Sequence, residues 1–137
     1  GWTKWEEVNT GDGGENFGWV AYEGGNGTNF RTGGYSNLTS VQNFYAREQR
    51  GEVTVTAPIY AFEHFGSGGN AIVVGDFYTG TTFPSTWDRN LFITDVSKGT
   101  VDALSFGSNG QVTGVRRFAN NLFGLVQITM GPDGSLY

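Results

Sequence analysis

Hydrophobic and polar positions alternate in short runs along most of the chain. Alternation suits β-strands, because successive side chains of a strand point to opposite faces, and the continuous apolar run at 71–78 suits a strand buried on both faces. The predicted strands lie at 17–22, 53–56, 59–65, 71–78, 91–95, 100–106, 112–118 and 122–130, and 135–137 opens another. The pattern therefore predicts an all-β chain.

Two stretches depart from this alternation. Residues 40–50 place apolar side chains at 41, 44 and 45, which is helical spacing, and Ser40 could cap a short helix that Gly51 ends. Residues 24–40 are almost all Gly, Asn, Thr and Ser, so we expect an extended loop there.

The later strands are separated by short turns. Lys98-Gly99 and Asn109-Gly110 are tight-turn sequences, and they divide 90–96, 100–107 and 111–118 into an up-and-down meander. Repeated four-stranded meanders are the unit of a β-propeller, and a blade takes about 40–50 residues. We expect residues 1–137 to be a single propeller segment of about two to three blades, incomplete at both ends.

Composition narrows the possible partners. The chain has 137 residues, 23 of them glycine, and a formal net charge of −5. It has no basic patch, so nucleic acid and anionic membrane surfaces are not expected as partners. The absence of cysteine excludes disulfides, thiolate zinc sites and a cysteine nucleophile. No apolar run approaches the ~20 residues of a membrane span.

The stretch 5–24 concentrates the candidate metal ligands. Its glycines allow tight turns at positive φ, so the loop could fold carboxylates and carbonyls inward, as a hard cation such as calcium requires. Its polar side chains are Glu6, Glu7, Asn9, Asp12, Glu15 and Asn16. The spacing of an EF-hand is absent, and a solvated acidic turn is the alternative.

Other chemistry is sparse. His64 is the single histidine, and no Gly-x-Ser-x-Gly elbow surrounds a serine. The tryptophans could form a platform for stacking carbohydrate, or could serve as core residues and loop anchors. Asn26-Gly27-Thr28 and Asn37-Leu38-Thr39 are acceptor triplets for N-glycosylation, which favours a surface position for both.

Five ordered motifs carry a resemblance to a known family. They are Trp5-Glu-Glu-Val-Asn9 with Gly14-Glu-Asn-Phe-Gly-Trp19, Ala57-Pro58 leading to His64, Gly75-Asp-Phe-Tyr-Thr-Gly80, Asn90-Leu-Phe-Ile-Thr-Asp95, and Gly131-Pro-Asp-Gly-Ser-Leu-Tyr137. In this order they resemble the C-terminal half of the glucose/sorbosone dehydrogenase family. The resemblance implies a partial six-bladed β-propeller from a secreted or periplasmic protein, and many members oxidise sugars with pyrroloquinoline quinone and calcium.

The resemblance also suggests site residues. It implies a structural calcium held by the Glu7 carboxylate and the Phe17 carbonyl, with Asn9 and Asn16 nearby. On the cofactor side, His64 matches a position near the cofactor face, and Lys98 lies about one position from a family lysine that contacts the quinone.

The family's catalytic histidine belongs to an early blade outside these residues. Where cofactor-binding members place two arginines, this chain has Gly124 and Val126, followed by Gln127, and the pair Arg116-Arg117 is out of register. Pyrroloquinoline quinone is therefore not expected to be bound by this chain.

Two functions remain open. The first is a non-catalytic, calcium-stabilised propeller module of an extracellular, cell-surface or periplasmic protein, acting in binding, with carbohydrate as a candidate ligand, or as a structural or accessory subunit. The alternative is part of a pyrroloquinoline-quinone-dependent aldose dehydrogenase whose catalytic half lies outside this chain. In both cases, the remaining propeller blades or neighbouring subunits are the expected partners.

Overall fold

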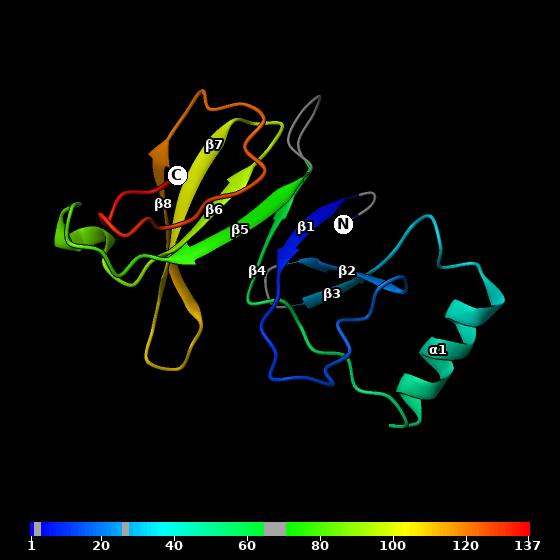
Figure 1. The fold of residues 1–137 in the computed structure, drawn as a ribbon. Coiled ribbons are helices and arrows are strands. Elements are labelled where there is room, and N and C mark those ends of the chain that lie inside the picture. Colours follow the sequence, from blue (N-terminus) through cyan, green and yellow to red (C-terminus); the bar gives the residue numbers. More distant parts are fainter. Residues whose placement is uncertain (2–3, 26–27, 65–70) are drawn as a thin grey trace. The chain divides into compact units, whose positions relative to one another are not determined.

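The computed structural model describes residues 1, 4–25, 28–64 and 71–137 and divides the chain into two compact units, Gly1–His64 and Phe65–Tyr137. Figure 1 shows that both are built mainly from β-strands, with one α-helix in the first unit. The paired strands of every described sheet run antiparallel, and these sheets are open. The prediction of an all-β chain with one short helix is confirmed.

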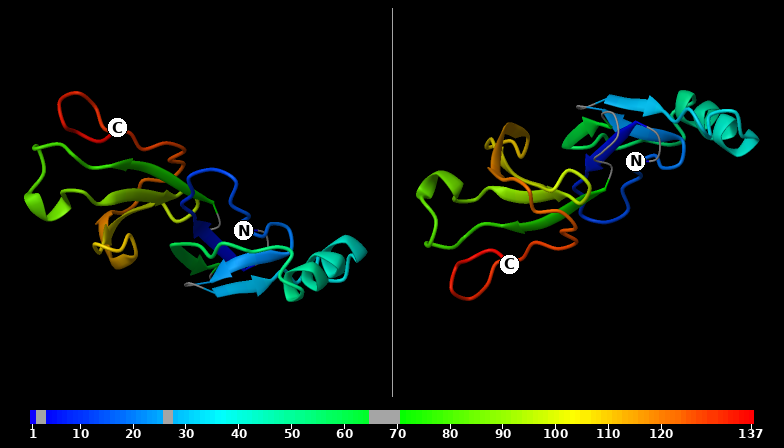
Figure 2. Two further views of the ribbon diagram at one scale, coloured as in Figure 1. Left: turned by 90° about the horizontal axis from the view of Figure 1, so that it is seen from below. Right: turned by 90° about the horizontal axis from the view of Figure 1, so that it is seen from above.

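The first unit contains two strand pairs. Strand β1 (Trp5–Val8) pairs with β4 (Tyr60–Glu63), and β2 (Tyr22–Gly25) pairs with β3 (Thr28–Arg31) as a hairpin. Helix α1 (Thr39–Gln49) follows β3. The two views in Figure 2 both place α1 beside this hairpin.

Helix α1 packs through its one apolar face. Val41 and Tyr45 are four residues apart, so they lie on the same side, and both are buried against Ala21 and Tyr22. The Tyr45 hydroxyl donates to the Ala21 carbonyl oxygen at 2.6 Å, which fixes the helix to the start of β2. Gly51 ends the helix at φ +73° as predicted, but Leu38, not Ser40, is the N-cap residue.

The second unit is a four-stranded meander. Strands β5 (Ile72–Phe77), β6 (Leu91–Asp95), β7 (Thr100–Phe106) and β8 (Val112–Ala119) pair in that order, and a 3₁₀ turn, η1 (Ser85–Trp87), lies between β5 and β6. The predicted turns are confirmed, because Gly99 and Gly110 both have positive φ. The outer strand β5 is half exposed, whereas β6 is buried along its whole length, so the expectation of full burial at 71–78 is wrong.

One hydrophobic cluster of the second unit lies on one face of this sheet. Phe92 and Val101 are buried there beside Tyr78, and the segment after β8 covers them with Ile128. Rings from η1 and β8 complete the cluster, with Phe118 at 5.0 Å from Phe92 between ring centroids. The figures show this last segment (orange to red) running along the sheet.

Several predicted strands differ from the structure. Residues 17–21 and 53–56 are outside any strand, because no neighbouring strand pairs with them in the described residues. Strands β1 and β3 were expected to be loops. The stretch 122–130 is irregular apart from a single bridge between Met130 and Leu136.

Candidate functional site

Strand β1 positions the first predicted metal ligand. Its side chains alternate, so Glu6 and Val8 are buried while Trp5 and Glu7 are half-buried on the opposite side. Glu7 pairs with Ala61 of β4. Its oxygen Oε2 also lies close to β2, where a Cβ added to Gly24 would be only 2.3 Å from it. The carboxylate is therefore held between two strand pairs.

Burial changes the acidity of this carboxylate. Loss of solvent raises the pKa of Glu7 above its usual value, and the neighbouring carboxylates of Glu23 and Glu6 raise it further. The terminal ammonium group and the N–H of Gly24 act in the opposite direction. Glu7 is thus a carboxylate whose negative charge is only partly compensated, which is the condition a cation would relieve.

Asn9 supplies a second unsatisfied oxygen in the same stretch. Its Oδ1 is buried and accepts no hydrogen bond from any residue that the structure describes. A buried amide oxygen without a partner costs about 1–3 kcal/mol, so such atoms usually mark a bound water or ion. Asn9 follows β1 directly, two residues after Glu7.

Backbone hydrogen bonds from the segment 56–59 hold the loop in which the other two predicted ligands lie. The N–H of Thr56 donates to the Asn16 carbonyl oxygen at 2.8 Å, and the N–H of Ile59 donates to the Val8 carbonyl oxygen at 2.9 Å. Both ends of the loop 9–16 are therefore bonded to one four-residue segment. Phe17 follows Asn16, whose Oδ1 accepts the N–H of Gly18 at 2.9 Å.

The remaining acidic side chains of this stretch have other partners. Glu15 accepts the N–H groups of Asp12 and Gly13 at 2.8 and 2.9 Å, which lowers the pKa of Glu15 and closes the exposed tip of the loop on itself. Glu6 instead contacts His64. Among the residues that the structure describes, no group of three or more acidic or histidine side chains is arranged to hold a metal. A cation on this loop would depend on amide and carbonyl oxygens as well.

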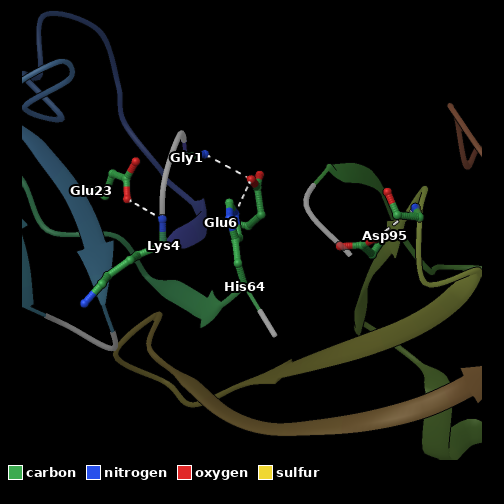
Figure 3. Close-up of polar contacts among 7 residues, drawn as sticks. Gly1, Lys4, Glu6, Glu23, His64 and Asp95 are labelled. Carbon is green, nitrogen blue, oxygen red and sulfur yellow. Dashed lines mark hydrogen bonds and ion pairs between the residues drawn. The ribbon is translucent and has the colours of Figure 1, made fainter. Parts of the chain in front are cut away.

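His64 is part of a partly buried polar cluster. Its Nε2 lies 2.8 Å from Oε1 of Glu6, and the terminal ammonium of Gly1 lies 3.2 Å from the same oxygen (Figure 3). Its backbone N–H donates to the Lys4 carbonyl oxygen at 2.7 Å and so extends the β1–β4 ladder. This environment gives His64 a structural role in the first unit, and its predicted place near a cofactor face stays a prediction.

A cavity of about 490 Å³ opens in the first unit. One aromatic ring and four charged side chains line it, together with exposed glycine backbone. The lining residues are Lys4, Trp5, Glu23, Arg31, Gly33, Gly34 and Glu63. Sequence reasoning missed this cavity, because its residues come from four separate segments and only Trp5 had been considered for ligand binding.

Two of the charged side chains that line this cavity are anchored. Glu23 is 2 % exposed, and its Oε2 accepts the backbone N–H of Lys4 at 2.8 Å (Figure 3). The Arg31 guanidinium lies 4.2 Å from the centre of the Tyr45 ring, to which it contributes a cation–π contact. With two cations and two carboxylates, the lining is balanced in charge.

The second unit holds the predicted cofactor residue Lys98. This residue is half-buried in the turn between β6 and β7, and its backbone N–H donates to Oδ1 of Asp95 at 2.9 Å. Asp95 accepts the N–H of Ser97 through the same oxygen. The turn geometry thus explains the position of the Lys98 backbone, and a contact of its side chain with a cofactor stays a prediction.

The arginine pair of β8 is already used within the second unit. The Arg116 guanidinium lies 3.5 Å from the centre of the Trp87 ring and donates to the Thr86 carbonyl oxygen at 2.8 Å. Arg117 donates to Asp102 at 2.6 Å and to Asn120 at 2.7 Å. Both guanidinium groups of this out-of-register pair therefore already have partners within the second unit.

The quinone therefore lacks matching cations in this chain. Gly124 has positive φ, Val126 is 75 % exposed, and Gln127 is neutral, so these positions cannot neutralise a carboxylate. Each charge-assisted hydrogen bond contributes about 1.5–3 kcal/mol, and a cofactor with three negative charges needs several. The residues at the matching positions do not fit pyrroloquinoline quinone.

Comparison with known proteins identifies one family. The family model described as "Glucose / Sorbosone dehydrogenase" matches residues 1–137. Neither a curated protein nor a solved structure matches the chain. The family match confirms the resemblance carried by the five motifs, and the open antiparallel sheets agree with a partial β-propeller.

Proposed function

We propose that this chain, which belongs to the glucose/sorbosone dehydrogenase family, is a non-catalytic, calcium-stabilised propeller module of a secreted or cell-surface protein. It acts in binding or as a structural or accessory subunit. The observation that supports the calcium assignment is the buried Asn9 Oδ1, which has no hydrogen-bond partner among the described residues and lies two residues from the Glu7 carboxylate, whose pKa is raised by burial.

The donor set suits a hard cation. Calcium takes six to eight oxygen ligands from carboxylates, amide oxygens, carbonyls and water. Glu7 and Asn9 would hold the ion through side-chain oxygens, and Phe17 would contribute its carbonyl. The Asn16 Oδ1 accepts one N–H and keeps a second lone pair, so it could join them. When bound, calcium would neutralise Glu7 and link the two ends of the loop.

Calcium titration of the chelator-treated chain tests this assignment. We expect calcium to raise the melting temperature, because a ligand that binds only the folded state at about 100 times its Kd adds about 2.7 kcal/mol. Glu7→Gln should raise the calcium Kd by about tenfold or more, which corresponds to a loss of about 1.4 kcal/mol in binding.

The matched control lies in the same loop. Asp12 is exposed, so Asp12→Asn removes an equal charge without touching the proposed ligands. It should leave the calcium Kd within about twofold, a change of about 0.4 kcal/mol. Equal weakening by both substitutions would indicate general charge attraction and would exclude this site.

The cavity of the first unit supports the binding role. Trp5 offers an apolar ring face, while Glu23 and Glu63 accept hydrogen bonds and Arg31 donates them. A neutral carbohydrate suits a lining with balanced charge better than a multiply charged ligand does. A saturable shift of the Trp5 indole N–H signal on addition of glucose would support this; its absence at concentrations of about 50 mM, well above a Kd of about 1 mM, would exclude it.

The alternative function is part of a quinone-dependent aldose dehydrogenase. The family's description favours it, because the match extends over residues 1–137. In that case other blades or a neighbouring chain would supply the catalytic histidine and the cations that bind the quinone. Dye reduction with glucose, pyrroloquinoline quinone and calcium tests it on the full-length protein. If Asn9→Ala abolishes this activity and excess calcium restores it, the chain both binds calcium near Asn9 and forms part of an active dehydrogenase.

The expected partners are the remaining propeller blades or neighbouring subunits, and the proposed location is extracellular, at the cell surface or in the periplasm. No helix in the described part of the chain is long and apolar enough to cross a membrane. Analytical ultracentrifugation tests the accessory role, because a chain that remains monomeric at all concentrations would count against self-assembly.

A further inference from the structure

A tight turn joins β3 to helix α1 and contains one of the two acceptor triplets. The N–H of Leu38 donates to the Tyr35 carbonyl oxygen at 3.0 Å, so residues 35–38 form a β-turn with Asn37 at its third position. The N–H of Ser36 donates to the Thr32 carbonyl oxygen at 3.0 Å and holds the turn from the other side. Asn37 is therefore presented on a defined loop.

The triplet is accessible on this turn. Asn37 and Thr39 are both exposed, and Leu38 between them is 50 % exposed. The Asn37 side chain makes no hydrogen bond to any residue that the structure describes. The backbone beneath it is nevertheless fixed, because α1 begins at Thr39 and is buried through Val41.

An aromatic residue precedes the acceptor on the same turn. Tyr35, two residues before Asn37, is half-buried and packs against the cluster beneath α1. Its ring meets that of Trp19 edge to face, with centroids 5.9 Å apart, and Trp19 is 53 % exposed. An exposed aromatic surface of this kind suits the C–H face of a sugar ring, because aromatic faces bind partly positive hydrogens.

We propose that Asn37 is an N-glycosylation site and that the first sugar of its glycan packs against Tyr35. The Asn37 Nδ2 forms a bond to the anomeric carbon of a lipid-diphosphate-linked oligosaccharide. The bond from that carbon to the lipid diphosphate breaks, the diphosphate leaves, and Nδ2 loses one proton. Thr39 supplies the hydroxyl that the transferase requires at the third position of the triplet. The inference uses the exported location of the proposed function and is independent of calcium.

The test is the full chain secreted from cultured eukaryotic cells behind a cleavable leader, so that export itself is not the variable. Peptide mapping after enzymatic glycan removal reports occupancy at each triplet. We expect Asn37 to be occupied, and both Asn37→Gln and Thr39→Ala to abolish the modified peptide. Asn43→Gln is the matched control, because Asn43 is exposed on α1 without an acceptor triplet. An unmodified Asn37 in the secreted wild-type chain would overturn the proposal.

A second measurement tests the contact with Tyr35. Each secreted variant is compared with its own enzymatically deglycosylated form, so that a change in folding cancels within the pair. Glycan removal should lower the melting temperature of the wild type and should have a several-fold smaller effect in Tyr35→Leu. An equal loss in both proteins would exclude packing of the sugar on Tyr35.

Discussion

The effect of Asn9→Ala should reverse between calcium-free and calcium-containing solution. Without calcium, the substitution removes a buried oxygen that has no hydrogen-bond partner. Such an atom costs about 1–3 kcal/mol, and the packing lost with the side chain offsets part of the gain. We expect the unfolding free energy to stay unchanged or to rise by about 1 kcal/mol.

With calcium, the same substitution removes a ligand. At a concentration about 100 times the wild-type Kd, calcium adds about 2.7 kcal/mol to the wild type, but only about 1.4 kcal/mol to a variant that binds tenfold more weakly. The variant should therefore lose about 1.3 kcal/mol of the stabilisation that calcium gives the wild type.

Amide hydrogen exchange at Thr56 and Ile59 measures this reversal. Their N–H groups donate to Asn16 and Val8, so their exchange reports opening of the base of the loop. Asn43→Ala serves as the control, because its effect must be the same in both solutions. If Asn9→Ala destabilises the loop equally with and without calcium, the orphaned oxygen is not a metal ligand.

Three further predictions concern stability. Gly24→Ala should cost about 1–3 kcal/mol in thermal unfolding, because its Cβ would lie 2.3 Å from Glu7 Oε2 and 2.4 Å from Pro58 Cγ; a neutral result would show that both can shift. Because its pKa is lowered in the folded state, the Glu15 carboxylate stabilises the fold above pH 4.5, and this stabilisation disappears as pH falls through the folded-state pKa. An NMR titration of Glu15 with a midpoint at or above 4.5 would contradict this. Phe92→Ala should cost about 3–5 kcal/mol by urea unfolding, because this ring is fully buried, and a cost below about 1 kcal/mol would disprove its central place in the core.

The meander of the second unit could be predicted because its signals are local. Alternating side chains mark the strands, and Lys98-Gly99 and Asn109-Gly110 mark the turns between them. By contrast, β1 pairs with β4 more than fifty residues later. Its glutamates, Glu6 and Glu7, are typical of a polar loop, and only the structure shows that Glu6 contacts His64. The irregular path of 122–130 was not predicted either, because Leu125, Ile128 and Met130 pack against the hydrophobic cluster of the sheet without pairing as a strand.

The metal site on the loop 5–24 stays a prediction. The sequence indicated a loop with candidate oxygen ligands, but it could not separate Glu15, which accepts hydrogen bonds from its own loop tip, from Glu7, which is held between strands. Nor could it predict the cavity, because Lys4, Arg31 and Glu63 meet only after β1, β3 and β4 fold together. The sequence also did not predict that Arg116 would stack on Trp87 or that Arg117 would pair with Asp102.

These two arginines have a consequence beyond the quinone. In the described residues β8 pairs only with β7, so its other side presents unpaired backbone groups that could recruit a strand from another molecule. The positive charge of Arg116 on such an edge repels an identical copy and discourages fibril growth, whereas the charge of Arg117 is paired with Asp102. Exchanging Arg116 and Arg117 for threonine should make concentrated solutions of this chain aggregate, even where the fold itself survives.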